Sequence, residues 1–411
     1  MIDLMQLREF PDAIIAALAK KDPSYDGKRL YHLDCQVREL RQEVENLRAR
    51  KNDLAKQGRS GITDTLREQS LSLGKELGEK EDTLLKLERE MRDLYLAAPN
   101  IPLNDVPVGG KEANKVVKMV GEKPVFSYSI KNHVELGVAL GWFDFESAAR
   151  MTGTNFPLYK NEAVFLIYRL ALLMLKNNMD HGYDPVIPPL LVNAQALEVT
   201  GNFPKFKDQV YTIGDDGLYL TPTSEVNLAN IYADHIFMAQ ELPVRLTSWT
   251  NCFRREAGGY GALERGLIRI HQFEKVELYS FCEPHDSPHE LDRMVACAEE
   301  ILKKLGLHYR ITLLAGQDCS FASTKTYDIE VWSPGQNSYL EVASCSNCTD
   351  FQSRRGKIRY RKTVDGKPQL VHTLNASSLA LPRIMVALME TYQQGDGMIM
   401  LPEILRNPIV F

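Results

Sequence analysis

The sequence predicts an α+β protein in which a long antiparallel helical hairpin precedes a body built on a mostly antiparallel sheet flanked by helices. Three observations support this prediction. Two series of apolar residues with heptad spacing lie on either side of a glycine-containing break at 58–61, a pattern typical of paired helices. A segment rich in Pro, Gly and Asn at 97–112 indicates a boundary between hairpin and body. From about residue 125 onward, strand-like and helical patterns alternate without repeats.

Composition is that of an ordinary globular protein, with 411 residues, 44% hydrophobic and 25% charged. The net charge of −5 does not indicate an RNA partner, so any basic surface must be local. Seven scattered cysteines favour a reducing compartment over a disulfide framework. The first residues lack an apolar stretch of signal-peptide length, and the apolar run 164–175 is too short to span a bilayer. We therefore expect a cytoplasmic protein without a membrane segment.

The hairpin is predicted over about 30–97, after a short helical start in which Pro11 opens a helix running to about Lys21. The first helix has an apolar seam of Leu33, Val37, Leu40, Val44, Leu47 and Leu54. The second helix has a seam of Leu66, Leu73, Leu77, Leu84, Leu87, Met91 and Leu94. Such a hairpin buries only one seam, so we expect it to project as an arm on the order of 50 Å long.

Charge is distributed unevenly between the two helices of this arm. Residues 36–60 carry seven Lys or Arg against four Asp or Glu, whereas residues 66–96 carry six against eight. These features alone leave two interpretations open, a dimerising coiled coil with solvated charges and an arm that binds nucleic acid.

The segment 253–281 contains two extended stretches joined by a Gly-rich turn. In the second stretch Arg269, Phe273 and Glu277 would share one face of a strand, because side chains alternate along it. The opposite face would carry Ile268, Ile270, Val276 and Leu278. Four residues of strand cover roughly 13 Å, enough to separate a purine ring from a small amino acid joined to it through a phosphate. A half-buried hairpin with a polar outer face is the alternative interpretation.

The Phe253–Glu256 start and the HQFEKVE segment at 271–277 resemble motif 2 of the class II aminoacyl-tRNA synthetases, and among these the seryl-tRNA synthetase family. The resemblance implies that the body is a class II catalytic domain. No GxxxxGK[ST] phosphate loop is present, and the HIGH and KMSKS signatures of class I synthetases are absent.

Two further blocks follow the order of the class. Residues 181–191, after an apolar helix at 162–178, resemble motif 1, with a Gly-aromatic turn and a strand containing Pro189. In this class motif 1 builds the dimer interface. Residues 374–383 enter a helix that runs to about Tyr392 and resemble motif 3.

The resemblance implies an ATP site made of Arg254, Glu256, Arg269, Phe273, Glu341, Ser344 and Arg383. Arg254 would grip the α-phosphate and Glu256 would read the adenine amino group, two residues apart on one strand face. Phe273 would stack on the adenine. Arg269 would reach the outer phosphates, and Arg383 would lie against the nucleotide.

The resemblance implies a serine site made of Thr223, Glu225, Arg254, Glu277, Asn375 and Ser377. Thr223 and Glu225 match the element that holds the substrate ammonium, whereas Glu277 and Ser377, with Asn375 close by, match positions that meet the serine hydroxyl. A buried carboxylate that awaits a hydroxyl rejects alanine, because an unpaired buried charge is costly. Threonine would be excluded by close packing.

Glu341 and Ser344 match positions that hold Mg²⁺ shared with ATP in this family, and oxygen ligands suit that ion. Their three-residue offset places them on opposite faces of a flat strand, so we expect a bulge or a strand end between them. Downstream, residues 353–362 contain six basic residues; a solvated surface and a contact to the RNA backbone remain alternatives.

The chain departs from the usual family pattern at four positions. Ala376, Ser378 and Pro382 stand where glycine is frequent, and Ala262 stands where arginine is frequent. Pro382 is acceptable in a first helical turn, where its missing N–H costs little. The change at Ala262 concerns the meeting of the motif 2 loop with the tRNA end.

The resemblance implies ATP-dependent activation of L-serine to seryl-adenylate and transfer of the seryl group to the 3′ end of tRNA(Ser), and of tRNA(Sec) where the organism has one. Residues 1–102 would form a tRNA-binding domain and residues 103–411 the catalytic domain, in a homodimer. Two alternatives remain: a related enzyme that activates another small amino acid or loads it on a carrier protein, and a non-catalytic RNA-binding paralogue. The arm disfavours carrier loading, and the filled polar positions disfavour the paralogue.

Overall fold

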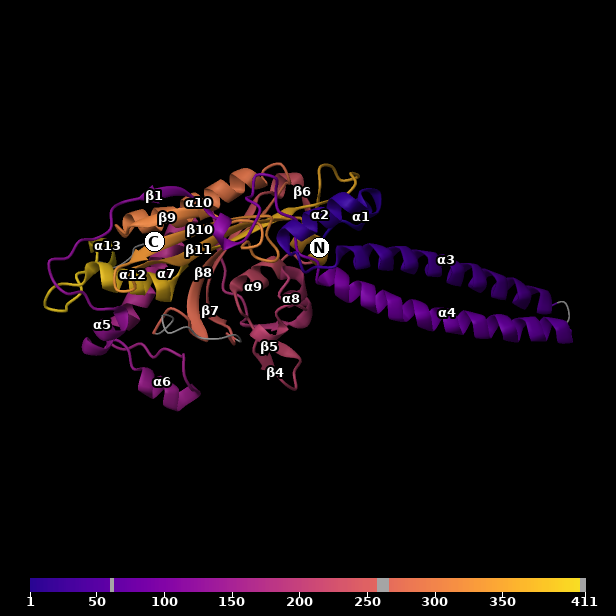
Figure 1. Cartoon of the computed structure of the whole chain (residues 1–411), viewed down its shortest axis with the longest axis horizontal. Coiled ribbons are helices and arrows are strands. Elements are labelled where there is room, and N and C mark those ends of the chain that lie inside the picture. Colours follow the sequence, from indigo (N-terminus) through magenta and orange to yellow (C-terminus); the bar gives the residue numbers. More distant parts are fainter. Residues whose placement is uncertain (60–62, 257–265, 407–411) are drawn as a thin grey trace. The chain divides into compact units, whose positions relative to one another are not determined.

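The computed structural model describes residues 1–59, 63–256 and 266–406, and the chain divides into two compact units, Met1–Pro99 and Asn100–Phe411. Figure 1 shows the elements of both units in the colours of the sequence.

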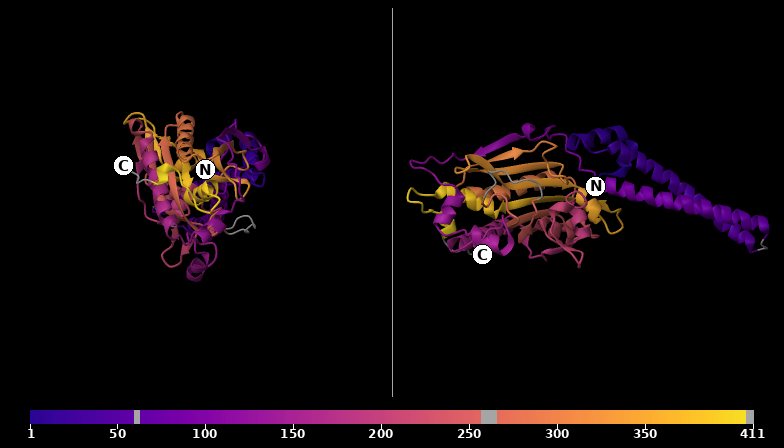
Figure 2. Two further views of the ribbon diagram at one scale, coloured as in Figure 1. Left: turned by 90° about the vertical axis from the view of Figure 1, so that its left-hand side faces the viewer. Right: turned by 60° about the horizontal axis from the view of Figure 1, so that its bottom comes forward.

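The first unit contains α1 (Leu4–Glu9), α2 (Pro11–Lys21), α3 (Gly27–Gly58) and α4 (Asp64–Leu96). Its main feature is the predicted hairpin, in which α3 and α4 lie side by side (Figures 1 and 2). Asp26 and Thr63 begin the two helices with side chains that accept backbone N–H groups of the first turns, as N-cap residues do. The heptad spacing therefore predicted both long helices, and the structure confirms them.

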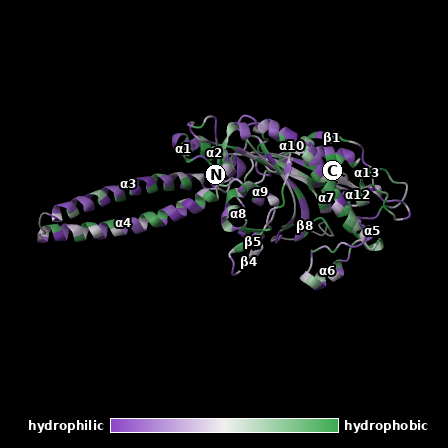
Figure 3. Ribbon diagram, turned by 180° about the vertical axis from the view of Figure 1, so that it is seen from behind, coloured by the Kyte–Doolittle hydropathy of each residue, from purple (hydrophilic) through white to green (hydrophobic). Residues whose placement is uncertain are grey.

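One apolar seam holds the hairpin together. Its buried core consists of Val44, Leu47, Leu73 and Leu77, with Leu54 and Leu84 packed against them. Hydrophilic and hydrophobic residues alternate along both helices in Figure 3, as expected for helices that bury a single face. Ion pairs bridge the helices on the outside: Arg29–Glu90 at 2.6 Å, Arg41–Glu88 at 2.5 Å and Arg48–Glu81 at 2.7 Å. Such exposed pairs each contribute little, so burial of the seam supplies most of the stability.

The second unit is built on an eight-stranded sheet with the order β1-β9-β10-β11-β14-β8-β7-β2. All neighbours pair antiparallel except β2 with β7, which confirms the predicted fold class. The strands are β1 (Lys115–Val120), β2 (Asp184–Pro185), β7 (Val244–Phe253), β8 (Gln272–Cys282), β9 (Tyr309–Leu313), β10 (Lys325–Ser333), β11 (Ser338–Thr349) and β14 (His372–Ala380).

Helices cover one face of this sheet. The main core joins apolar residues of α7 (Glu162–Asp180), α10 (Ser287–Lys304) and α12 (Leu381–Tyr392) to Val276 and Leu278 of β8 and to their neighbours on β10, β11 and β14. The shorter helices α5 (His133–Ala139), α6 (Phe145–Thr152) and α13 (Glu403–Arg406) belong to the same unit.

The opposite face of the sheet is covered only in part. A second core packs Tyr279 and Phe281 of β8 against residues from smaller elements. These elements are α8 (Ala194–Thr200), α9 (Ser224–Asn230), β6 (Ile236–Met238) and β12 (Arg359–Arg361). The same unit also contains α11 (Phe351–Gly356), the strand β13 (Gln369–Leu370) next to β12, and a small sheet of β3 (Leu191–Asn193), β5 (Leu218–Leu220) and β4 (Thr212–Ile213). Short 3-10 turns occur at Lys111–Ala113, Lys207–Gln209 and Ala239–Glu241. The rest of this face, outside the second core, borders a cavity.

The predicted motif 2 hairpin is correct in its strands and wrong at its ends. Strand β7 stops at Phe253 and β8 starts at Gln272, so Arg254, Glu256 and Arg269 lie in the connecting segments. Alternation therefore holds for Phe273 and Glu277 but does not extend to Arg269. Ile268 and Ile270, expected on the core face, line the same cavity as Arg269.

The predicted motif 1 strand is also shorter than expected. Strand β2 contains only Asp184 and Pro185, and Pro189 lies between strands. Three prolines between 185 and 189 remove backbone donors, which limits ladder pairing. Within the described ranges, no helix combines the length and apolar character needed to cross a membrane.

Candidate active site

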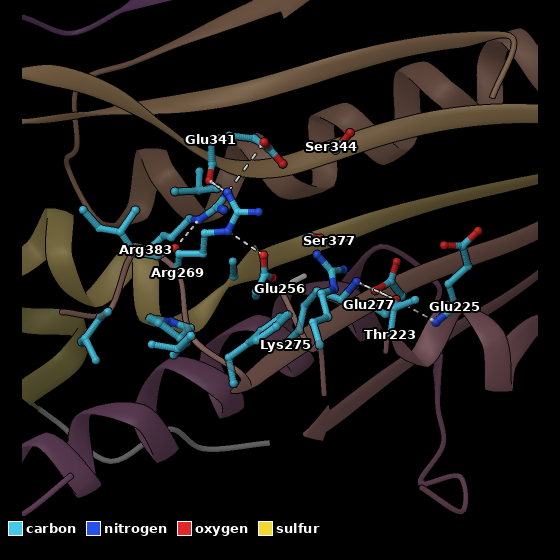
Figure 4. Close-up of a pocket in the computed structure, with 18 of the residues that line it drawn as sticks. Thr223, Glu225, Glu256, Arg269, Lys275, Glu277, Glu341, Ser344, Ser377 and Arg383 are labelled. Atoms are coloured by element: carbon cyan, nitrogen blue, oxygen red, sulfur yellow. Dashed lines mark hydrogen bonds and ion pairs between the residues drawn. The ribbon is translucent and has the colours of Figure 1, made fainter. Parts of the chain in front are cut away.

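A cavity of about 470 Å³ opens on the sheet face that α7, α10 and α12 leave uncovered (Figure 4). Every residue predicted for the serine, ATP and metal sites lines it: Thr223, Glu225, Arg254, Glu256, Arg269, Phe273, Glu277, Glu341, Ser344, Asn375, Ser377 and Arg383. Figure 4 places Arg269, Arg383 and Glu341 towards one end and Thr223, Glu225 and Glu277 towards the other. We call these the cationic end and the carboxylate end.

Neighbouring strands deliver half of these side chains, and Glu341 and Ser344 come from β11. Phe273 and Glu277 come from β8, and Asn375 and Ser377 from β14. Ser377 lies directly opposite Glu277 in the ladder. Because alternate residues share a face, two adjacent strands present a row of polar groups to the same cavity.

A buried ion pair forms the floor of the carboxylate end. The ammonium of Lys275 pairs with the carboxylate of Glu277 and donates a hydrogen bond to the Thr223 hydroxyl at 2.7 Å. Thr223 in turn donates to Glu277 Oε2 at 3.2 Å. All three side chains are buried, so the group is fixed before any ligand arrives. Sequence reasoning missed Lys275, although it shares the parity of Phe273 and Glu277 on β8.

Glu225 supplies a second carboxylate at this end from the first turn of α9. Its Oε1 accepts hydrogen bonds from Gln352 at 2.7 Å and from Asn375 at 3.0 Å. Burial, followed by the nearby charge of Glu277, raises the pKa of Glu225 to about 7. Burial likewise raises the pKa of Glu277, which the Lys275 ammonium opposes. Two desolvated carboxylates around one space are suited to an organic cation with hydrogen-bond donors.

The cationic end holds its charges in more open pairs. Arg269 Nε lies 2.6 Å from Glu256 Oε2. Arg383 donates to the Glu341 carbonyl at 2.7 Å, and its Nη1 lies 3.7 Å from the Glu341 carboxylate. Both arginine side chains are 33% exposed. Guanidinium groups in this setting can exchange a carboxylate for a phosphate without losing charge-assisted hydrogen bonds.

Arg254 contacts the ring of Phe273 and the backbone at Pro222. Its guanidinium stacks over the Phe273 ring at 5.2 Å from the centroid, and its Nε donates to the Pro222 carbonyl at 3.2 Å. The ring of Phe273 thus supports a cation here.

The predicted bulge between Glu341 and Ser344 is confirmed. In the β10–β11 ladder Glu330 faces Glu341 and Ile329 faces Ala343, so Val342 is the extra residue. A bulge changes which face the following residues occupy, and both Glu341 and Ser344 line the cavity.

The oxygen groups at this bulge fit a divalent cation such as Mg²⁺. Asp328 lies opposite Ser344 on β10, and its buried Oδ1 has no hydrogen-bond partner among the described residues. Burial next to Glu341 raises the pKa of Asp328 to about 8. No group of three or more His, Cys, Asp or Glu in the described ranges could hold a metal alone, so phosphate oxygens and water would have to complete the coordination.

Two family models match the chain. The seryl-tRNA synthetase N-terminal domain matches residues 1–102, and the class II tRNA synthetase core domain (G, H, P, S and T) matches residues 209–392. A curated protein named serine–tRNA ligase from Magnetococcus marinus is 42% identical over 99% of this chain and 98% of its own length. The chain belongs to the seryl-tRNA synthetase family.

Solved structures of class II seryl-tRNA synthetases agree with this assignment. The seryl-tRNA synthetase of Pyrococcus horikoshii, solved with ATP, has a TM-score of 0.90 and 33% identity over 98% of this chain and 97% of that one. The cytoplasmic serine–tRNA ligase of Naegleria fowleri, solved with AMP, has a TM-score of 0.83 and 26% identity over 99% and 96% of the two chains.

The structure accounts for two of the departures from the usual pattern of the seryl-tRNA synthetase family. Ser378 is a bulge residue, because Ser377 faces Glu277 whereas Leu379 faces Val276. Its hydroxyl donates to Asn178 Oδ1 of α7 at 2.9 Å, so the added polar group is satisfied. Pro382 lies in the first turn of α12, as expected.

The other two departures are Ala376 and Ala262. Ala376 is buried in the main core, where a methyl group adds apolar contact. Ala262 lies outside the described residues.

The basic segment at 353–362 is partly engaged within its own unit. Arg354 pairs with Asp350 at 2.5 Å, and Arg355 donates to the Glu198 carbonyl at 2.8 Å. Arg359 lies 3.7 Å from Asp234. A contact between this segment and RNA stays a prediction.

Proposed function

We propose that the protein activates L-serine with ATP to form seryl-adenylate and then transfers the seryl group to the 3′ end of tRNA(Ser), and of tRNA(Sec) where that acceptor exists. The observation that carries this proposal is the single cavity with a carboxylate end and a cationic end. An amino acid with a free ammonium and a hydroxyl suits the first end, and a nucleoside triphosphate suits the second.

In the serine half, Glu225 would hold the substrate ammonium, with Gln352 and Asn375 fixing the carboxylate. Glu277 would accept the serine hydroxyl, with Ser377 opposite it. Lys275 and Thr223 keep Glu277 oriented. Alanine cannot satisfy Glu277, so the buried carboxylate would lose a partner.

In the nucleotide half, Arg254 would bind the α-phosphate, with Phe273 stacking on adenine and Glu256 reading its amino group. Arg269 would bind the outer phosphates after leaving Glu256, and Arg383 would lie against the nucleotide after leaving Glu341. The serine carboxylate, already ionised at neutral pH, attacks the α-phosphorus in line. The bond to the bridging oxygen breaks and pyrophosphate leaves. No general base is needed, so alignment and charge neutralisation carry the catalysis.

Glu341 and Ser344 would hold Mg²⁺, with Asp328 beside them. When bound, the ion neutralises charge on the triphosphate. The chain's own contribution is the bulge that turns both oxygen groups towards the cavity.

Residues 1–102 would form the tRNA-binding domain and residues 103–411 the catalytic domain. On α3, Arg41 and Arg48 pair with α4 carboxylates, whereas the exposed Arg38, Arg50 and Lys51 form no ion pair with any described residue. We propose that these three contact the tRNA backbone. Their joint replacement by alanine should lower tRNA affinity about tenfold or more and reduce its salt dependence, while Arg48→Ala serves as the control.

We further propose a homodimer in the cytoplasm. Phe165 and Tyr168 of α7 are more than half exposed, and Ile187 in the segment that follows is 95% exposed. Apolar side chains of this kind support a second copy as the partner. Light scattering should give about twice the 46.6 kDa mass of one chain, and a monomer at micromolar concentration would reject the dimer.

The decisive experiment is amino-acid-dependent ATP–pyrophosphate exchange with serine, alanine, glycine and threonine. Serine should drive exchange with the highest kcat/KM, and Arg254→Ala should reduce that kcat/KM by about 10²–10³-fold. Faster exchange with any other amino acid would overturn the substrate assignment. An RNA-binding paralogue would show no exchange with any amino acid.

A further inference from the structure

We propose that His133 is a positioning residue, held by Glu390, that anchors the backbone carrying Arg269 into the cationic end of the cavity. This inference rests on the proposed activation of serine by ATP. His133 opens α5, and Glu390 lies in α12. Neither side chain lines the cavity.

Glu390 is a buried carboxylate surrounded by donors. Its Oε1 accepts the backbone N–H of His133 at 3.0 Å and lies 3.0 Å from His133 Nδ1. Its Oε2 accepts the backbone N–H of Gly335 at 3.0 Å and the hydroxyl of Ser333. His133 and Glu390 are at most 1% exposed. Both oxygens of this carboxylate are therefore engaged by hydrogen-bond donors.

These contacts fix the tautomer of His133. The backbone N–H of Leu267 is directed at Nε2, so Nε2 is the acceptor nitrogen of the ring. Nδ1 therefore carries the ring proton and donates it to Glu390. The ring is left with one lone pair that points away from Glu390.

The backbone of the motif 2 segment meets that lone pair. The N–H of Leu267 donates to His133 Nε2 at 3.3 Å. The preceding residue, Gly266, has φ +73°, and a Cβ there would come within 2.3 Å of Nε2. The close approach therefore requires a residue without a side chain at position 266. Gly266 and Leu267 together fix the position of this segment against the His133 ring.

The contact between Leu267 and His133 positions residues that line the cationic end of the cavity. Leu267, Ile268 and Arg269 all line the cavity. The Ile268 carbonyl accepts from Arg383 Nε at 3.4 Å, and Arg269 pairs with Glu256. An anchor two residues before Arg269 thus sets the position of two arginines, and a displacement near 1 Å is costly for catalysis.

A purely structural role for the pair would predict a different result, namely loss of stability with no selective effect on ATP. His133→Asn separates the two roles. Its amide can still donate to Glu390 from the place of Nδ1 but has no acceptor near Leu267. Ser333→Ala is the matched control, because it removes one donor to Glu390 and touches neither Leu267 nor the cavity.

We expect His133→Asn to raise KM for ATP about tenfold in pyrophosphate exchange, the effect of one lost hydrogen bond at a positioning site. KM for serine should change less than about twofold, because the carboxylate end does not depend on the anchor. His133→Gln, which restores an acceptor near Leu267, should recover KM for ATP in part. Ser333→Ala should lower the Tm and leave KM for ATP unchanged. A His133→Asn variant with unchanged KM for ATP, or one in which both KM values rise together, would overturn the proposal.

Hydrogen–deuterium exchange provides a readout that does not need activity. His133→Asn should increase exchange at the Leu267 amide, whereas Ser333→Ala should not, and equal protection in both variants would reject the anchor. Should His133→Asn fail to fold, Gly266→Ala attacks the same contact from the other side and should likewise raise KM for ATP. If the unsubstituted protein shows no exchange reaction with serine, the proposed function fails, and protection of Leu267 still decides the role of His133.

Discussion

The two ends of the cavity hold their charges in different ways. At the carboxylate end Lys275, Glu277 and Thr223 are buried and bonded to one another. At the cationic end Arg269 and Arg383 are one-third exposed and paired with carboxylates that a phosphate can replace. A buried group is preorganised and expensive to disturb, whereas open pairs are easily exchanged. Under the proposed function, amino-acid selection would depend on the rigidity of the carboxylate end, and nucleotide binding would depend on charge exchange at the cationic end.

The largest effect is expected for Arg254, which lines the cavity and contacts Phe273. Arg254→Ala should reduce kcat/KM for pyrophosphate exchange by about 10²–10³-fold, since it removes the charge that we propose binds the α-phosphate. Arg254→Lys keeps the charge but loses the planar fork, and should recover only a part. A variant that loses less than tenfold would show that the reaction does not occur at Arg254.

At the carboxylate end, Glu277→Gln should raise KM for serine by about 10²-fold and lower the free energy of unfolding by about 3 kcal/mol or more, because Lys275 stays buried without its partner. KM for ATP should stay within about twofold. Thermal unfolding of the double variant Lys275→Met/Glu277→Gln gives the control, since removal of both charges should restore stability without restoring serine binding. Equal increases in both KM values would mean that the two ends are not independent.

The pH dependence of kcat/KM for serine tests the role proposed for Glu225 at the carboxylate end. Glu225 has a pKa of about 7 and must be ionised to hold an ammonium group. Lowering the pH through about 7 protonates it, so kcat/KM for serine should fall towards tenfold per pH unit below 7 and level off above it. Glu225→Gln should remove this dependence together with most of the activity. A profile that stays flat from pH 6 to 8 would contradict the assignment of Glu225.

The smallest effect on stability is expected for the partly exposed Arg269–Glu256 ion pair. Glu256→Gln should change the free energy of unfolding by less than about 1 kcal/mol, since the Arg269 pair is partly solvated. Thermal unfolding next to Glu277→Gln measures this contrast directly. KM for ATP should respond and KM for serine should not. A loss of stability equal to that of Glu277→Gln would remove the distinction between the ends.

Sequence patterns predicted what depends on short-range periodicity. Heptad spacing was sufficient for α3 and α4, because each seam residue reports a local helical face. The offset of Glu341 from Ser344 was sufficient for the bulge. Parity on β8 was correct from Phe273 to Glu277 and failed at Arg269, since nothing local indicates where a strand begins.

Contacts between distant segments could not be predicted in this way. His133 and Leu267 are separated by 134 residues, and no spacing rule relates them. Lys275 was overlooked for another reason: a lysine between two site residues is usually solvated, and only the fold shows that it is buried with Glu277. The link between Ser378 and Asn178 likewise depends on how α7 packs on β14.

The proposed function is tested most directly by the binding affinities of two non-hydrolysable sulfamoyl mimics, one of seryl-adenylate and one of alanyl-adenylate. Calorimetric titration measures both affinities. The mimics share every group at the cationic end and differ by one hydroxyl at Glu277. We predict that the seryl mimic binds at least about 10²-fold more tightly, because only it gives the buried carboxylate a partner. Equal affinity for the two would contradict the central claim that one cavity joins a serine-selective end to a nucleotide end.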